Sequence, residues 1–202
     1  MKHFISLLFT EEKKITPFDF ISAECEVLKS MEITPDLSVN IRQVIDRIDR
    51  VYPEGHYGND ALAKLRIVDY KTGSDDIDFS DFDQLFNNSE LHRRKAIVQL
   101  LFYCNAYAEH TGYAGPITPV IYQMKTLSTF GLRPVTRKSD GSDGKKKGAI
   151  PVVDYREIND EFLARFKGVV KEMFDEHTPF TQAPDDHNCK FCSLTAICRR
   201  TK

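Results

Sequence analysis

The segment Ile67–Gly73 contains two side chains that can act together in hydrolytic chemistry. Its sequence, IVDYKTG, is typical of a β-strand, in which successive side chains point to opposite faces. Asp69 and Lys71 are therefore expected on one face of the strand, with Val68 on the other. A carboxylate and an ammonium group at this spacing can form part of a catalytic site. An ordinary ion pair on a strand has the same spacing, so both interpretations stay open.

A second pair of acidic residues lies in the preceding stretch, which also has strand character. Asp46 and Asp49 are three positions apart, so in a regular strand they point to opposite faces, and only one can share a site with Asp69. Two carboxylates on adjacent strands form a hard-oxygen site that suits Mg²⁺. Such a site supports phosphodiester hydrolysis, in which a lysine orients the attacking water or offsets charge on the phosphate. The alternative is a ladder of ion pairs with Arg47 and Arg50.

Two polar side chains fall on one face of a predicted helix. Gln99 and Tyr103 are four positions apart, so they lie beside each other next to the apolar stripe. Taken alone, this pair is also what the edge of an ordinary helix contains. The pair therefore indicates function only in combination with the acidic residues and the lysine.

Three of the five cysteines crowd into the C-terminal end of the chain, as Cys189, Cys192 and Cys198. An odd number of cysteines fits a disulfide framework poorly and fits a metal or cluster site well. Zn²⁺ is one alternative, because thiolates together with the imidazole of His187 suit that ion. His187 is only two residues from Cys189, however, which is tight for tetrahedral closure.

The elements that must position these residues are mainly strands in the first third of the chain. Alternation of apolar and polar residues predicts neighbouring antiparallel strands over residues 20–33, 39–52 and 65–72. A further strand is expected over residues 116–126, and a short one within residues 149–155.

Two helices are expected to pack on these strands. Asn88 or Ser89 can cap a helix that continues past Cys104, and an amphipathic helix is predicted over residues 159–176. The order of elements predicts a mixed α/β fold with a central sheet flanked by helices. The remaining segments receive no helix or strand: residues 1–20 have no clear periodicity, residues 75–89 are an acidic connection, and residues 136–149 are a polar loop.

Length and composition set the limits of these predictions. The 202 residues favour a single domain with one sizeable core over residues 1–202. With 41% hydrophobic and 29% charged residues, the chain contains no apolar run long enough to span a membrane, and no signal peptide is evident, so a cytoplasmic protein is expected. The net charge of −2 provides no overall attraction to nucleic acid, so phosphate binding must come from a local patch or from bound metal.

Four motifs, in order, resemble one family. The segments VIDRID, IVDYKTG, QLLFYCNAY and CKFCSLTAIC are similar to those of the PD-(D/E)xK nuclease superfamily, specifically its RecB-like branch. This branch includes the AddB-type repair nucleases and the CRISPR-associated adaptation nucleases. The resemblance extends from about Phe20 to Cys198, and it implies a restriction-endonuclease-like core that uses Mg²⁺ or Mn²⁺ to cut DNA.

The resemblance also implies roles for individual residues. Asp46 and Asp69 become metal ligands together with the backbone carbonyl of Tyr70, and Lys71 becomes the catalytic lysine. The resemblance leaves Asp49 outside the site, a choice that the spacing alone does not make. On the helix, Gln99 and Tyr103 match the QxxxY motif, which in this branch lies beside the active site and the DNA.

The C-terminal cysteines match the iron–sulfur staple of the same branch. Cys189, Cys192 and Cys198 would be three of the four ligands of a [4Fe-4S] cluster, an incomplete set, with Cys25 or Cys104 as substitutes for the fourth. The relatives carry the fourth cysteine and a metal-binding histidine in an upstream helical region. In this chain, His3 lies in no such motif. Gln43 also stands where many relatives have glycine. The resemblance therefore predicts that the chain is a C-terminal fragment of a larger polypeptide.

The sequence leaves two functions open. The first is a metal-dependent deoxyribonuclease, of exonuclease type, that works in DNA repair or recombination beside a helicase. The second is a non-catalytic nuclease-like module that binds DNA or a protein and uses the cysteines as a structural metal clip. Metal-dependent cleavage of DNA discriminates between them.

Overall fold

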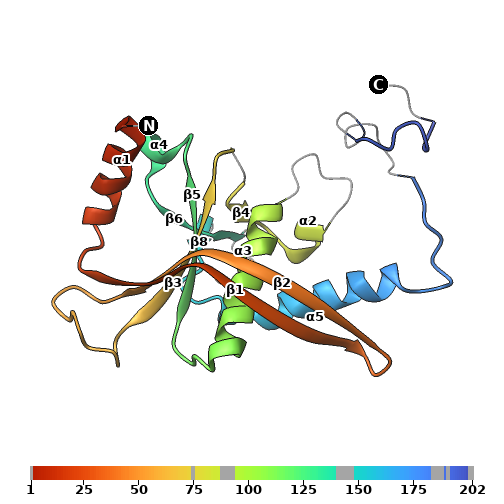
Figure 1. The fold of residues 1–202 in the computed structure, drawn as a ribbon, viewed down its shortest axis with the longest axis horizontal. Coiled ribbons are helices and arrows are strands. Elements are labelled where there is room, and N and C mark those ends of the chain that lie inside the picture. The colour runs from red at the N-terminus through yellow and green to blue at the C-terminus, as the bar shows by residue number, and fades with distance from the viewer. Residues whose placement is uncertain are drawn as a thin grey trace.

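The computed structural model describes residues 2–73, 76–86, 94–139, 148–182, 189 and 192–199. Its helices are α1 (Lys2–Lys13), α2 (Phe82–Phe86), α3 (Lys95–Thr111), α4 (Leu127–Phe130) and α5 (Arg156–Met173). Its strands are β1 (Phe18–Thr34), β2 (Leu37–Val51), β3 (Lys64–Lys71), β4 (Asp78–Phe79), β5 (Ile117–Gln123), β6 (Arg133–Pro134), β7 (Thr136–Ser139) and β8 (Gly148–Pro151) (Figure 1). Within the described ranges, no helix has both the length and the apolar composition needed to cross a membrane.

The central sheet has five strands in the order β1-β2-β3-β5-β6. Strands β1, β2 and β3 are antiparallel neighbours, as their sequence pattern predicts, whereas β5 runs parallel to β3. The parallel pair is possible because α3 provides the crossover connection between β3 and β5. A smaller sheet of β4, β7 and β8 adjoins it. The predicted mixed sheet flanked by helices is therefore confirmed.

The two faces of this sheet are covered by different helices. On one face, Ile67 of β3 and Ile121 of β5 are fully or almost fully buried in the main core, which also contains Leu100 of α3. On the other face, Val68 and Tyr122 belong to a smaller apolar cluster that packs against α1. We call these the α3 face and the α1 face. Alternate residues of β3 thus contribute to two separate cores.

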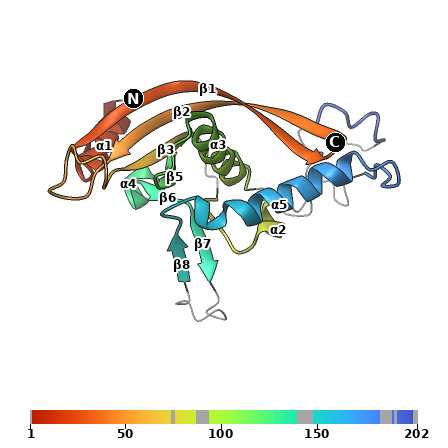
Figure 2. The same ribbon diagram turned by 90° about the horizontal axis from the view of Figure 1, so that it is seen from below.

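Helix α3 lies between the long β1–β2 hairpin and α5. Figure 2 shows the hairpin arching across α3, with α5 on the far side of that helix. Phe102 of α3 packs edge-on against Phe162 and Phe166 of α5, with ring centroids 4.9 and 4.5 Å apart. Gly112 follows the last residue of α3, and its φ of 67° is the left-handed conformation that favours glycine after a helix. This packing fixes α3 beside the sheet.

Several segments form elements that the sequence pattern did not predict. Residues 2–13, left unassigned, form α1, and the acidic connection contains β4 and α2, with Phe79 and Phe82 buried. The flanks of the polar loop form β7 and β8, while residues 140–147 lie outside the described residues. Asn88 and Ser89 also lie outside them, and the described helix begins at Lys95. Each of these elements is stabilised by contacts with residues that are distant in the sequence. Local periodicity gives no information about such contacts.

Candidate active site

The site is built where β2 and β3 part. The last paired residues of this ladder are Arg47 and Val68, so the next residues along the two strands are Asp46 and Asp69. Beyond this pair, the backbone N–H of Tyr70 donates a hydrogen bond to the Asp46 carboxylate at 2.8 Å. The Asp46 carboxylate therefore takes the place of a backbone acceptor where the ladder ends. This hydrogen bond holds Asp46 beside β3.

Strand β2 is not regular at this point. Ile45 and Ile48 are three positions apart, which in a regular strand places them on opposite faces, yet both are fully buried in the main core. Across the hairpin, Glu24 of β1 has a φ of 49°, an uncommon conformation for a residue other than glycine. The side that faces the core therefore changes at Asp46, which the spacing of residues in a regular strand does not predict.

Asp69 and Lys71 lie on the α3 face of β3 and contact each other. The Lys71 ammonium group is 2.9 Å from Asp69 Oδ2 and 3.1 Å from Oδ1. Asp69 is 1% exposed, whereas the Lys71 side chain is 23% exposed. A buried carboxylate is thus held by an ammonium group that still reaches solvent. The contact follows from strand alternation; the catalytic roles of both residues stay predictions.

Helix α3 brings Gln99 and Tyr103 to the same place. Lys71 Nζ donates to Gln99 Oε1 at 2.8 Å, and Gln99 Nε2 donates to the Tyr103 hydroxyl. Burial raises the pKa of Tyr103 to about 12, and the negative charges of the nearby carboxylates, chiefly Asp69 and then Asp46, act in the same direction. The tyrosine therefore keeps its proton at neutral pH. Lysine, amide and phenol form one hydrogen-bonded chain that ends close to both carboxylates.

Asp49 lies on the α1 face and belongs to a different set of contacts. It is fully buried and accepts hydrogen bonds from Arg47 at 2.8 Å and from Arg66 at 3.0 Å. Arg50, the other arginine of the predicted ion-pair ladder, instead contacts Asp60 at 3.2 Å. Of the acidic residues in this stretch, Asp49 is therefore the one that forms ion pairs with arginines. Asp46 holds a backbone amide of β3 instead.

The structure also places residues at the site that sequence reasoning missed. Gln123 of β5 is paired in register with Lys71, so its buried side chain lies on the same face, and Met124 N–H donates to the Lys71 carbonyl at 2.9 Å. Glu24 is close enough to raise the pKa of Tyr103 through its charge. No sequence signal identified Gln123, because its position depends on the register of two strands separated by the whole of α3.

The donor set fits a hard divalent cation. Asp46 and Asp69 supply carboxylate oxygens, which Mg²⁺ and Mn²⁺ prefer, and Mg²⁺ usually keeps several water ligands and uses only one or two carboxylates. In the described part of the chain, no three His, Cys, Asp or Glu side chains converge as a ready-made metal cluster. A site of two carboxylates completed by water agrees with that finding. The side chain of His3, in α1, lies outside the described ones.

The C-terminal cysteines do not form a metal-binding group in the described part of the chain. Cys189, Cys192 and Cys198 are half-buried, and the Cys192 N–H donates to the Cys189 carbonyl at 3.0 Å. The Leu194 N–H donates to the Cys192 sulfur at 3.4 Å. His187, the alternative zinc ligand, lies outside the described residues.

The two other cysteines belong to the main core or pack against it. Cys104 of α3 is completely buried in the main core, and this burial raises the pKa of its thiol well above the usual value. Cys25 of β1 packs against the same core. Both therefore behave as small apolar side chains, and their assignment as a fourth cluster ligand stays a prediction.

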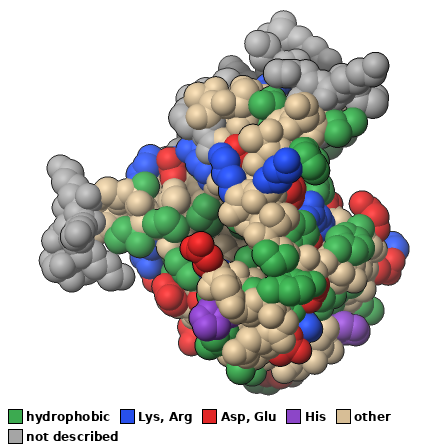
Figure 3. Space-filling view, turned by 90° about the vertical axis from the view of Figure 1, so that its left-hand side faces the viewer, with side chains coloured by type: hydrophobic (Ala, Val, Ile, Leu, Met, Phe, Trp, Pro, Cys, Tyr) green, Lys and Arg blue, Asp and Glu red, His purple; other side chains and the backbone are tan. Residues whose placement is uncertain are grey.

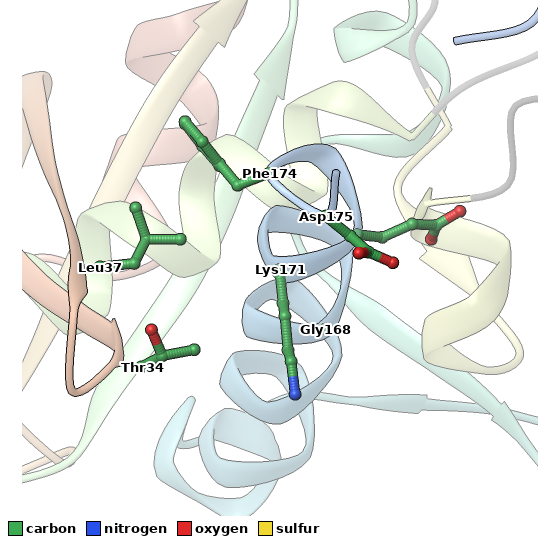
Figure 4. Close-up of a pocket in the computed structure, with 7 residues that line it drawn as sticks. Thr34, Leu37, Gly168, Lys171, Phe174 and Asp175 are labelled. Atoms are coloured by element: carbon green, nitrogen blue, oxygen red, sulfur yellow. The ribbon is translucent and has the colours of Figure 1, made fainter. Parts of the chain in front are cut away.

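A separate hollow lies at the other end of the molecule, between the β1–β2 turn and the end of α5 (Figure 4). Thr34 and Leu37 line it from the hairpin, Lys171 lines it from α5, and Phe174 and Asp175 follow the end of that helix. It contains none of the residues described above. The candidate site at the parting of β2 and β3 is therefore separate from this hollow.

Comparison with protein families agrees with this geometry. The model of the PD-(D/E)XK nuclease superfamily matches residues 2–199, and the chain belongs to this superfamily. A search of curated proteins finds no significant match. The superfamily consists generally of nucleases, and its members typically use Mg²⁺ or Mn²⁺.

The different surroundings of Asp46 and Asp49 predict different effects on stability. Asp49→Asn removes a buried charge that balances two arginines, so we expect the free energy of unfolding to fall by about 3–5 kcal/mol. Asp46→Asn keeps an oxygen that accepts from the Tyr70 amide, so its cost should be below about 1 kcal/mol. Urea denaturation of both variants measures this difference. Equal losses in the two variants contradict the assignment.

The raised pKa of Tyr103 predicts a dependence of stability on pH. The folded protein holds this proton more tightly than the unfolded chain, whose tyrosines have the ordinary pKa of 10.0. Its contribution is complete below pH 10 and is lost as the pH rises through the folded pKa of about 12. Tyr103→Phe should therefore lose less stability across this interval, as measured by urea denaturation at both ends. Equal losses for the variant and the parent would show that Tyr103 is not buried near the carboxylates.

Proposed function

We propose that this chain is a metal-dependent deoxyribonuclease whose central chemical groups are Asp46, Asp69 and Lys71. The observation that carries the proposal is the position of these residues where β2 and β3 part. Asp46 holds the Tyr70 amide, and Lys71 contacts Asp69 at 2.9 Å. Membership in the PD-(D/E)XK superfamily supports the same reaction class.

Each group has a distinct task in phosphodiester hydrolysis. Asp46 and Asp69 would hold the cation, with the carbonyl of Tyr70 as a further ligand. A bound Mg²⁺ or Mn²⁺ supplies Lewis acidity, which polarises the phosphoryl group and helps to ionise the attacking water. Lys71 presents an ammonium group that orients this water or offsets the charge that develops on the phosphate.

The hydrogen-bonded chain on α3 keeps the lysine in place. Gln99 accepts from Lys71 and donates to Tyr103, so the amide fixes both neighbours at once. Tyr103 keeps its proton because its pKa is about 12, so it is available as a hydrogen-bond donor to a phosphate oxygen. Gln99 and Tyr103 therefore serve in positioning the lysine and the substrate.

The distribution of surface charge indicates that DNA would be attracted by particular groups and not by the protein as a whole. Figure 3 shows acidic and basic side chains intermixed on one face of the molecule. The net charge is −2, so phosphate binding depends on the cation and on Lys71. DNA is the substrate we propose.

We further propose that the chain is a RecB-like exonuclease of DNA repair or recombination, and that it works beside a helicase. The QxxxY pair of α3 and the C-terminal cysteines support this branch. Cys189, Cys192 and Cys198 would bind a [4Fe-4S] cluster, with Zn²⁺ as the less favoured ion. Cys25 and Cys104 carry free thiols in or against the main core, which supports a reducing compartment such as the cytoplasm.

The proposal predicts cleavage that depends on both the metal and the lysine. End-labelled linear DNA incubated with Mg²⁺ or Mn²⁺ should be shortened by the parent chain and left intact when EDTA is added. Lys71→Ala should reduce the cleavage rate by at least about 100-fold, because it removes the group that orients water and offsets charge. Lys64→Ala, at the opposite end of β3, is the matched control and should cut as the parent does.

The other outcomes have clear meanings. Equal cleavage by Lys71→Ala and the parent contradicts the assignment of the lysine. If the parent binds DNA but does not cut it with either metal, the chain is instead the non-catalytic nuclease-like module.

A further inference from the structure

The α1 face carries an ionic cluster directly behind the candidate site. We call Glu12, Arg47, Asp49 and Arg66 the back-face cluster; all four side chains are at most 13% exposed. Both guanidinium groups also lie against the ring of Phe18, at 5.2 and 5.3 Å from its centroid. Two carboxylates thus balance two guanidinium groups in a nearly dry environment.

Glu12 contacts all three strands that carry the candidate site. Its Oε1 atom accepts from Arg47 of β2 at 2.9 Å and from the hydroxyl of Tyr122 of β5. Its Oε2 atom accepts from Arg66 of β3 at 3.2 Å. A single carboxylate from α1 therefore ties β2, β3 and β5 together from the face opposite the site.

These contacts occur at the point where β2 and β3 part. Arg47 is the last paired residue of β2 and directly follows Asp46, and its Nη1 atom also donates to the Tyr70 hydroxyl at 3.2 Å. Tyr70 is in turn the residue whose amide holds Asp46. Tyr122 precedes Gln123, which is paired with Lys71. The positions of both candidate metal ligands thus depend on residues that Glu12 holds.

The charge of Glu12 has a second consequence. Without it, Arg47 and Arg66 would face Asp49 alone, which leaves one uncompensated positive charge behind Asp46 and Asp69. Positive charge in a poorly solvated region weakens the binding of a cation nearby. Geometry and charge therefore act in the same direction.

We propose that Glu12 is a positioning residue that sets the separation and charge environment of Asp46 and Asp69, and thereby the affinity of the site for a divalent cation. This inference rests on the proposed function of the same site. It assigns α1 a role in cation binding although Glu12 lies on the other side of the sheet.

Mn²⁺ binding to the full chain tests this role directly. By titration calorimetry, Glu12→Gln should bind Mn²⁺ about tenfold more weakly than the parent, the size of effect found for groups that orient metal ligands. The matched control is Glu11→Gln, on the same helix and equally buried, with side-chain exposures of 14% and 13% for Glu11 and Glu12. Glu11 contacts Lys14 and the Leu132 amide, so this variant should bind Mn²⁺ as the parent does.

Cleavage assays separate positioning from simple destabilisation. Glu12→Gln should need a correspondingly higher Mn²⁺ concentration for half-maximal cleavage and should recover its rate when Mn²⁺ is saturating. A merely structural role would lower the melting temperature without changing the Mn²⁺ affinity of the folded protein, and that result would overturn the proposal. If Glu12→Gln does not fold, Tyr122→Phe replaces it, since it removes one bond to Glu12 and keeps every charge; unchanged Mn²⁺ affinity there would also overturn the proposal.

The parent protein distinguishes this inference from the proposed function. If the parent binds Mn²⁺ and cuts DNA, but Glu12→Gln has the affinity of the parent, only the role of Glu12 is wrong. If the parent neither binds Mn²⁺ nor cuts DNA, the proposed function fails and the inference fails with it.

Discussion

The hydrogen bond from the Tyr70 amide to the Asp46 carboxylate is the interaction on which the candidate site depends. It occurs where the β2–β3 ladder ends, after the pair Arg47–Val68. A ladder that continued with backbone bonds would leave the Asp46 side chain with no such contact to β3. The interruption brings Asp46 next to the segment that carries Asp69 and Lys71. The rest of the structure supports this interruption from both sides of the sheet.

On the α3 face, Gln99 of helix α3 holds Lys71 and contacts Tyr103. On the α1 face, the carboxylate of Glu12 balances the positive charges of Arg47 and Arg66. Alternation along β3 places Asp69 on the α3 face and Arg66 on the α1 face. On β2, the irregularity at Asp46 brings this carboxylate to the Tyr70 amide, while Asp49 contacts the arginines of the α1 face. The two sets of charges therefore lie close together without neutralising each other. This separation explains how one short stretch, IDRID, contributes both to a candidate metal site and to a buried ionic cluster.

Much of this arrangement could be predicted from the sequence, and the rest could not for physical reasons. Strand alternation predicted that Asp69 and Lys71 meet, and the order of strands and helices predicted the mixed sheet. The choice between Asp46 and Asp49 needed the family resemblance, because periodicity gives only opposite faces. Helix α1 was missed because it is stabilised by distant contacts, such as those of Glu12 with three strands. Gln123 was missed because its place depends on the parallel register of β3 and β5.

A site for a divalent cation between Asp46 and Asp69, where β2 and β3 part, can be located without relying on activity. The measurement is anomalous diffraction from crystals soaked in Mn²⁺, because the anomalous signal gives the position of the ion. We expect an anomalous peak within coordination distance of both carboxylates, on the α3 face of the sheet. A peak at Asp49 and Glu12 on the opposite face, or no peak beside Asp46 and Asp69 at saturating Mn²⁺, would contradict it.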